Sequence, residues 1–141
     1  MATRGLPTWP HLGESPDALP DAERLILDAA RAWAGPGPAG PIGEAVLVLA
    51  SQGAEGMALL LDPLLRALPG LHPGCLLCPA VSPSEAAFIL AISTAQHGTR
   101  GLALGLLHSL APPLGAYRAM PALIQLACAL KRGGITLTPS L

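Results

Sequence analysis

A helix start at Ser82 constrains the fold of this chain more than any other sequence feature. Ser82 and Glu85 have the spacing of a capping box, in which each side chain accepts a hydrogen bond from a free backbone N–H group of the first turn. Pro83 occupies the first helical position, where its missing N–H removes no hydrogen bond. The segment that follows, residues 86–92 (AAFILAI), has no polar face. A helix that is apolar on every side must be surrounded by protein or lipid.

The length of this helix favours a protein core over a membrane. We expect it to span residues 83–97 and to end where Gly98 adopts the left-handed conformation common after helices. That gives about 14 residues, whereas a helix needs about 20 apolar residues to cross a bilayer. A longer uncharged segment, residues 101–117, is interrupted by Pro112 and Pro113. The sequence therefore predicts no transmembrane span.

The rest of the sequence predicts an all-α fold, with a single compact domain of five to six short helices around the buried helix at about 83–97. The length of 141 residues fits one domain, and 51% hydrophobic residues are enough for a core. Residues 1–18 are rich in Pro, Gly and small polar residues and predict a flexible tail, so the helical domain spans 19–141. The other helices are expected at residues 20–34, 42–53, 54–68, 99–111 and 121–132.

The helix expected at 20–34 carries its charges on one face. Arg24, Asp28 and Arg31 recur at steps of four and three residues, opposite an apolar face. This pattern is typical of a solvated helix surface with local ion pairs. We therefore expect Arg31 to be exposed to solvent.

Residues 42–53 are compatible with two structures. Residues 45–50 are apolar enough for a buried strand, and the glycines that follow, Gly53 and Gly56, give this segment a likeness to the phosphate-binding loop of an α/β domain. However, the glycine spacing differs from the usual motif, no lysine follows, and only residues 135–137 offer a further strand. We expect a helix ended by Gly53, with a phosphate-binding α/β domain as the alternative.

The low charge of the chain predicts contact with another protein. Only 12% of the residues are charged, against about a quarter in typical soluble proteins. This suggests that a second copy or another partner covers apolar surface, so we expect a homo-oligomer or a protein complex. The helices at 99–111 and 121–132 are the expected contact faces, because neither has a continuous polar stripe. A net charge of −1 without a basic run argues against a nucleic-acid partner.

Cysteine usage favours a reducing compartment. The chain has three cysteines, and no secretory signal is recognisable, because Pro7, Pro10 and Pro16 interrupt a terminus that lacks an apolar segment. Cysteines in such a protein are expected to be free thiols or metal ligands. The expected location is the cytoplasm.

The segment HPGCLLC, residues 72–78, is a candidate metal site. Cys75 and Cys78 have the spacing that places two thiolates on one tetrahedral metal, and His72 precedes them by the same step. Cys128 is a possible fourth ligand, and zinc or an iron–sulfur cluster would suit ligands rich in sulfur. Against this hypothesis, the spacer consists of two leucines, and the chain has no second ligand pair.

Other uses of the cysteines stay open. They are compatible with buried thiols that only pack, and also with a disulfide or redox pair. A redox pair is expected at a helix N-terminus, where the dipole lowers the thiol pKa, whereas here the helix begins only at Pro83. Cys128 lies in the apolar stretch ALIQLACAL and is expected to pack in the core. We predict no catalytic residue, because no nucleophile elbow, triad spacing or carboxylate pair is recognisable.

Three features of the chain follow one another in order. An early helix, AERLILDAARAWA, is followed by the Cys75 and Cys78 pair with Pro79, and then by the Ser82 helix start. This order resembles a small bacterial family known as a domain of unknown function, and the resemblance covers residues 22–137. It implies a helical fold and no assigned activity. Members of that family have adjacent cysteines, whereas this chain spaces them.

Together these observations predict a small soluble helical protein that acts as a non-enzymatic interaction or self-associating module. The first alternative is a small metalloprotein that binds zinc or an iron–sulfur cluster through His72, Cys75 and Cys78. The second alternative is the phosphate-binding α/β domain.

Overall fold

The computed structural model describes residues 9–139, and the regular secondary structure of this part of the chain is entirely helical, without a strand. The all-α fold predicted from the sequence is therefore confirmed. The described residues form six α-helices: α1 (Asp21–Ala34), α2 (Gly40–Leu49), α3 (Ala58–Arg66), α4 (Pro83–Gln96), α5 (Arg100–His108) and α6 (Pro113–Arg132). Three short 3-10 helices accompany them: η1 (Pro16–Ala18), η2 (Ala50–Gln52) and η3 (Glu55–Met57).

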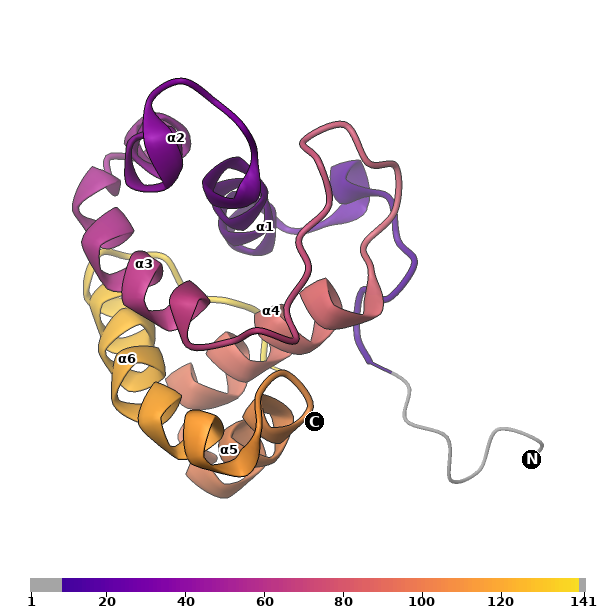
Figure 1. Cartoon of the computed structure of the whole chain (residues 1–141), viewed down its shortest axis with the longest axis vertical. Coiled ribbons are helices and arrows are strands. Elements are labelled where there is room, and N and C mark those ends of the chain that lie inside the picture. Colours follow the sequence, from indigo (N-terminus) through magenta and orange to yellow (C-terminus); the bar gives the residue numbers. More distant parts are fainter. Residues whose placement is uncertain (1–8, 140–141) are drawn as a thin grey trace.

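Helix α4 lies at the centre of the fold. It packs against α5 and α6 and also contacts α1, while α1 and α2 lie side by side and α3 packs on α6 (Figure 1). Ten of its 14 residues are buried, including Phe88, Ile89 and Ile92. This burial follows from the sequence, because a helix without a polar face gains most free energy when it is covered on all sides.

The predicted capping box is present at the start of α4. The Ser82 hydroxyl accepts a hydrogen bond from the Glu85 N–H at 3.3 Å, and the Glu85 carboxylate accepts one from the Ser82 N–H at 2.9 Å. At the other end, Gly98 has a φ of +94°, a conformation that side chains with a Cβ rarely adopt. Both ends of the central helix are therefore specified locally.

We expect Ser82→Ala to lower the free energy of unfolding by about 1 kcal/mol, because a backbone N–H group of the first turn loses its acceptor. Urea denaturation measures this change. Ser51→Ala is the matched control: its hydroxyl is also bonded locally, to the Val48 carbonyl at 2.8 Å, but on an exposed residue outside the α-helices. We expect the control to change stability by less than about 0.5 kcal/mol. Equal unfolding curves for wild type and Ser82→Ala would contradict the role of the cap.

Two helix boundaries test the sequence predictions for other segments. Residues 45–50, which the phosphate-binding alternative takes as a strand, belong to α2 and, at Ala50, to η2, and Gly53 follows with a φ of +68°. The α/β alternative therefore has no strand in the described chain. The last helix begins at Pro113 and not near Pro121, which lies inside α6. The predicted start at Pro121 is therefore too late, because Pro113 already fits a first helical position and Pro121 can be tolerated within a long helix.

Segments at both ends of the described chain pack onto the helices. The Gly13 N–H donates to the Val81 carbonyl and the Val81 N–H to the Glu14 carbonyl, each at 2.9 Å. The Thr138 N–H donates to the Glu23 carboxylate at 2.9 Å. Residues 9–18 of the predicted tail are thus in contact with the body, whereas residues 1–8 lie outside the described range.

The structure also bears on the membrane prediction. Within residues 9–139, no helix combines the length and the apolar character that crossing a membrane requires.

Candidate functional site

The cysteine pair lies on the loop between α3 and α4, and we call residues 72–81 the dithiol loop. Figure 1 shows this loop beside the segment that contains η1. The Sγ atoms of Cys75 and Cys78 are 3.3 Å apart, and the Cys78 N–H donates to the Cys75 carbonyl at 3.1 Å, which closes a tight turn. Cys75 is exposed and Cys78 is half-buried. The turn thus presents two neighbouring thiols with different access to solvent.

A buried ion pair lies beneath this loop. Arg31 of α1 and Glu85 of α4 form two parallel contacts, from Nε to Oε2 at 2.7 Å and from Nη2 to Oε1 at 2.9 Å. Arg31 is only 1% exposed and Glu85 only 2%. This bidentate geometry is the strong form of an arginine–carboxylate ion pair, and it joins two helices that are far apart in sequence.

The remaining hydrogen bonds of the ion pair hold the loop backbone. Arg31 Nη1 donates to the Cys78 carbonyl and Nη2 to the Ala80 carbonyl, both at 3.0 Å. Glu85 Oε2 accepts from the Gly74 N–H at 2.9 Å. The dithiol loop is therefore held in place by side chains from two different helices.

The burial of Arg31 corrects the sequence prediction that it is solvated. Arg24 and Asp28 do form the expected surface pair at 2.9 Å, so the prediction is right for the rest of that face. Arg31 differs because it lies one turn further along α1, where α4 and the loop cover it. The pattern of α1 contains no signal for this, since the covering groups come from residues 78–85.

The ion pair determines the charge states of its members. Burial alone would raise the pKa of Glu85, but hydrogen bonds from Arg31 and from the backbone of Ser82 and Gly74 outweigh it and hold that pKa below its usual value. The same pair raises the pKa of Arg31, chiefly through the hydrogen bond to Glu85. Both groups are therefore charged at neutral pH.

The environment of Cys75 favours its thiolate. The pKa of Cys75 is lowered, first by the hydrogen bond with the Cys78 thiol and then by the backbone N–H of Leu77, with a smaller effect from the charge of Arg31. Sequence reasoning expected such an effect only at a helix N-terminus. Here the neighbouring Cys78 thiol and the backbone of the turn are the largest causes of the lowered pKa.

Gly74 is a further residue that sequence reasoning missed. A Cβ added at this position would lie 2.8 Å from the Sγ atom of Cys78, closer than real Cβ atoms come to a neighbour. The absence of a side chain at Gly74 therefore leaves room for the sulfur of Cys78. A close contact of this kind depends on tertiary geometry and leaves no pattern in the sequence.

The structure brings together two of the predicted metal ligands. Cys75 and Cys78 are adjacent, whereas His72 is exposed, with its backbone N–H bonded to the Ser84 hydroxyl at 3.1 Å. Two sulfurs on one zinc lie about 3.8 Å apart for tetrahedral Zn–S bonds of about 2.3 Å, so the pair is near that separation. Over residues 9–139, no three His, Cys, Asp or Glu side chains converge as a metal site would require. Metal binding stays a prediction.

The exposure of the cysteines corrects two sequence expectations. Cys128, expected to pack in the core, is exposed on α6, and Cys75 is not a buried packing thiol. Cys128 is exposed because of its position in the helical repeat, since the buried positions around it are Leu126, Ala127, Ala129 and Leu130. A helix with many alanines has no clear apolar face from which to read that register.

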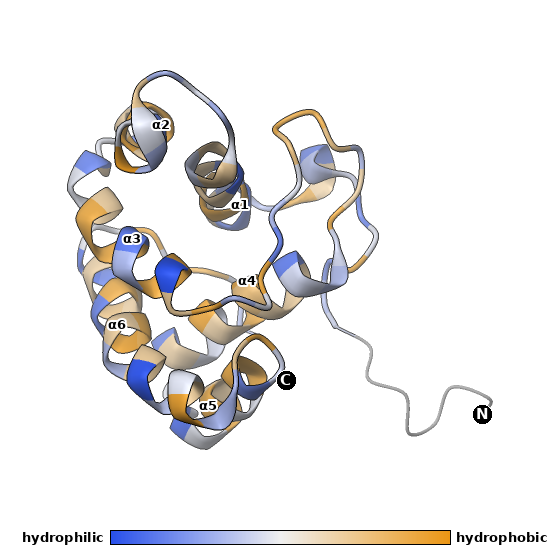
Figure 2. Ribbon diagram, in the orientation of Figure 1, coloured by the Kyte–Doolittle hydropathy of each residue, from blue (hydrophilic) through white to orange (hydrophobic). Residues whose placement is uncertain are grey.

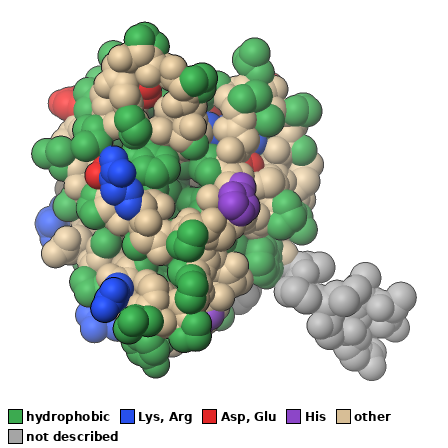
Figure 3. Space-filling view, in the orientation of Figure 1, with side chains coloured by type: hydrophobic (Ala, Val, Ile, Leu, Met, Phe, Trp, Pro, Cys, Tyr) green, Lys and Arg blue, Asp and Glu red, His purple; other side chains and the backbone are tan. Residues whose placement is uncertain are grey.

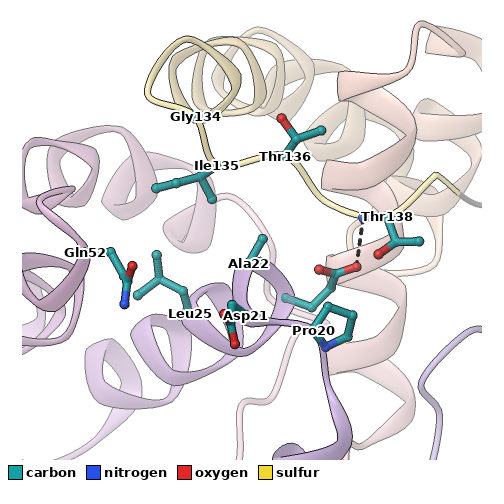
Figure 4. A pocket seen from close by; sticks show the side chains of 10 residues that line it. Pro20, Asp21, Ala22, Leu25, Gln52, Gly134, Ile135, Thr136 and Thr138 are labelled. Carbon is teal, nitrogen blue, oxygen red and sulfur yellow. Dashed lines mark hydrogen bonds between the residues drawn. The ribbon is translucent and has the colours of Figure 1, made fainter.

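A separate pocket of about 330 Å³ lies between α1, η2 and the segment after α6 (Figure 4). Its lining residues are Pro20, Asp21, Ala22, Glu23, Leu25, Gln52, Gly134, Ile135, Thr136 and Thr138. Glu23 is buried: Oε2 accepts the Thr138 N–H, and Oε1 has no hydrogen-bond partner within the described chain. The acidic residues here belong to the first turn of α1, where carboxylates favourably meet the helix dipole.

Comparison of the chain with known protein families, with curated proteins and with solved structures found no match. The resemblance to a small bacterial family therefore stays a prediction.

Proposed function

We propose that this protein is a non-enzymatic interaction module that self-associates through the dithiol loop. One observation supports this proposal above others. Leu76 and Leu77, at the tip of the loop, are 50% and 91% exposed, although the loop backbone is fixed by the buried Arg31–Glu85 pair. Figure 2 shows hydrophobic residues at the outer end of this loop.

A fixed loop with apolar side chains at its tip is well suited to binding. Because the backbone is already ordered, association costs little of the entropy that a flexible loop would lose. Covering Leu77 removes apolar surface from water, worth about 1.5–3 kcal/mol for a fully buried leucine. The free energy gained by covering the leucine is therefore offset by a smaller loss of entropy than it would be on a mobile segment.

The charge of the chain favours a second copy as the partner. The net charge is −1, so two copies approach each other without strong repulsion. On the face drawn in Figure 3, hydrophobic and uncharged atoms cover most of the surface, and Lys and Arg side chains gather in few places. Self-association of this chain in the cytoplasm, with its thiols reduced, is the setting that we propose.

The helix faces expected from the sequence are the competing contact. Leu102 on α5, and Leu114 and Tyr117 on α6, are exposed. They lie on regular helices, and the Tyr117 ring already makes an edge-on contact with His108, with 5.9 Å between the ring centroids. We favour the loop because both of its leucines lie next to each other at a projecting turn.

We expect sedimentation equilibrium under reducing conditions to give a dimer or larger species at micromolar concentration. The double variant Leu76→Ser/Leu77→Ser should weaken this association at least about tenfold, since each tenfold corresponds to about 1.4 kcal/mol. The matched variant Leu114→Ser/Tyr117→Ser removes similar apolar surface from α6 and should leave association unchanged.

Two results would overturn the proposal. A monomer at every concentration would exclude self-association. Weakened association in the α6 variant, with the loop variant unaffected, would move the contact to the helix face. Circular dichroism of both variants shows whether the helices are intact, so a loss of association is not confused with unfolding.

A further inference from the structure

We infer that Cys75 and Cys78 form a redox-active dithiol, which exchanges with a disulfide of another molecule, with Cys75 as the attacking thiol and Cys78 as the resolving thiol. This activity goes beyond the proposed self-association and uses different atoms of the same loop. It needs the two sulfurs, whereas the proposed contact needs the leucines between them.

The unequal exposure of the two thiols assigns their roles. Cys75 is exposed and can be reached by a disulfide in solution, whereas Cys78 is half-buried beside Gly74. In thiol–disulfide exchange, the accessible sulfur attacks first and its neighbour resolves the product. The exposure of the two thiols therefore supports a first attack by Cys75 and a second by Cys78.

The distance between the sulfurs allows the second step. They lie 3.3 Å apart and a disulfide bond measures about 2.05 Å, so closing the bond needs an approach of only about 1.3 Å. Arg31 and Glu85 hold the backbone of the loop at Gly74, Cys78 and Ala80, not the sulfur atoms. The side chains can therefore rotate toward each other while the backbone stays in place.

The setting of the pair favours exchange over inert thiols. The Cys78 N–H donates to the Cys75 carbonyl at 3.1 Å, so one tight turn holds both sulfurs together, with Cys75 open to solvent. An exchange reaction needs an accessible attacking thiol and a second thiol within its reach. Cys128 is exposed as well but lies on α6, outside this turn, so it provides an internal comparison.

The reaction balances as a two-electron exchange. The Cys75 thiolate attacks one sulfur of a disulfide R–S–S–R, the S–S bond breaks, and R–S⁻ leaves and takes a proton from solvent. The Cys78 thiol then loses its proton to solvent and attacks Cys75 Sγ, which releases a second R–SH. The products are a Cys75–Cys78 disulfide and two thiols, so the protein is oxidised as the partner disulfide is reduced.

Glutathione redox buffers test this inference on the full chain, purified without added metal or affinity tag. After equilibration, remaining thiols are alkylated and the chains are weighed by mass spectrometry. We expect the wild type to convert, as the share of oxidised glutathione rises, to a species lighter by two hydrogens before alkylation, with one alkylatable thiol left. Cys128→Ser should convert in the same way, whereas Cys75→Ser and Cys78→Ser should not.

Two further variants separate the roles and the hypotheses. Cys78→Ser, treated with glutathione disulfide, should accumulate a mixed disulfide at Cys75, because no resolving thiol is present. Cys75→Ser should form less mixed disulfide at Cys78 in the same time. Leu76→Ser/Leu77→Ser keeps both sulfurs and should oxidise like the wild type even though its self-association is expected to be weakened, so the two proposals can fail independently.

Three results would overturn the inference. The first is a wild type that forms no internal disulfide at any glutathione ratio while its helices remain intact. The second is alkylation of Cys75 at a rate no greater than that of Cys128 at neutral pH. The third is near-stoichiometric zinc or iron that protects Cys75 and Cys78 from alkylation and is lost in Cys75→Ser/Cys78→Ser, which would assign the thiols to a metal.

Discussion

Replacing Arg31 with methionine is expected to lower the free energy of unfolding by about 3–5 kcal/mol. The change removes the positive charge but keeps an apolar side chain that can fill space. It leaves the Glu85 carboxylate, 2% exposed, without its ionic partner, and it takes a donor from the carbonyls of Cys78 and Ala80. A buried charge without a partner is among the most costly changes in a protein. Urea denaturation followed by circular dichroism measures the loss.

Arg24→Met is the matched control for this prediction. Arg24 lies on the same helix and pairs with Asp17 at 2.8 Å and Asp28 at 2.9 Å, but both pairs are partly exposed. We expect a cost below about 1 kcal/mol, as for other surface ion pairs. The double variant Arg31→Met/Glu85→Gln should be less destabilised than the two single changes added together, because no charge remains buried. Equal losses for Arg31→Met and Arg24→Met would show that burial of the pair contributes little.

The same pair predicts an acid limit to stability. The pKa of Glu85 is lower in the folded protein than its ordinary value, which is about 4.3 for an unfolded chain. A group of this kind stabilises the fold above its unfolded pKa and loses that contribution as pH falls through the folded pKa. We therefore expect stability to decline below about pH 4, and Glu85→Gln to decline less steeply over that range. Parallel pH profiles for the two proteins would contradict this.

Placing a charge in the central helix is expected to have the second large effect. Ile89→Asp puts a carboxylate at a position that is 2% exposed in α4, between packed apolar side chains. Because its neighbours are apolar and the buried Arg31 is already paired with Glu85, the new carboxylate gains no free partner, and we expect a cost of several kcal/mol and loss of the folded state. Circular dichroism and a thermal melt show the outcome.

Leu59→Asp is the control for the substitution itself. Leu59 also lies in an α-helix and is also apolar, but it is 68% exposed on α3. The new carboxylate stays in water, so we expect a change within about 0.5 kcal/mol, the usual range for surface substitutions. If Ile89→Asp folds as well as Leu59→Asp, α4 is not the central helix of the protein in solution.

The central helix illustrates what local sequence signals can specify. Ser82, Pro83 and Glu85 lie within one turn, so their cap forms from neighbours alone, and Gly98 ends the helix by its own conformational freedom. The apolar residues 86–92 between them must be shielded from water, whichever elements of the fold pack on them. The all-α class and the position of α4 were therefore readable from the chain.

The dithiol loop depends on contacts that local sequence patterns do not predict. Two sequence patterns are incomplete here for the same reason: the capping-box pattern accounts only for the cap at Glu85, and the pattern of α1 indicates a solvated face at Arg31. A carboxylate has lone pairs for several donors, so the cap does not exhaust Glu85, and it also accepts from Arg31 and Gly74. The pattern of α1 identifies a charged face but contains no information on which charge meets a partner 54 residues away.

The sequence by itself determined the helical class, the capped central helix and the adjacency of Cys75 and Cys78 on one turn. Each depends on residues within a few positions of one another, where hydrogen bonding and spacing act directly. Only the tertiary structure decided that Arg31 is buried, that the loop is held from two helices, and that Cys75 is exposed while Cys78 is partly covered. Those outcomes depend on how α1 and α4 pack, which brings together groups that no local pattern relates.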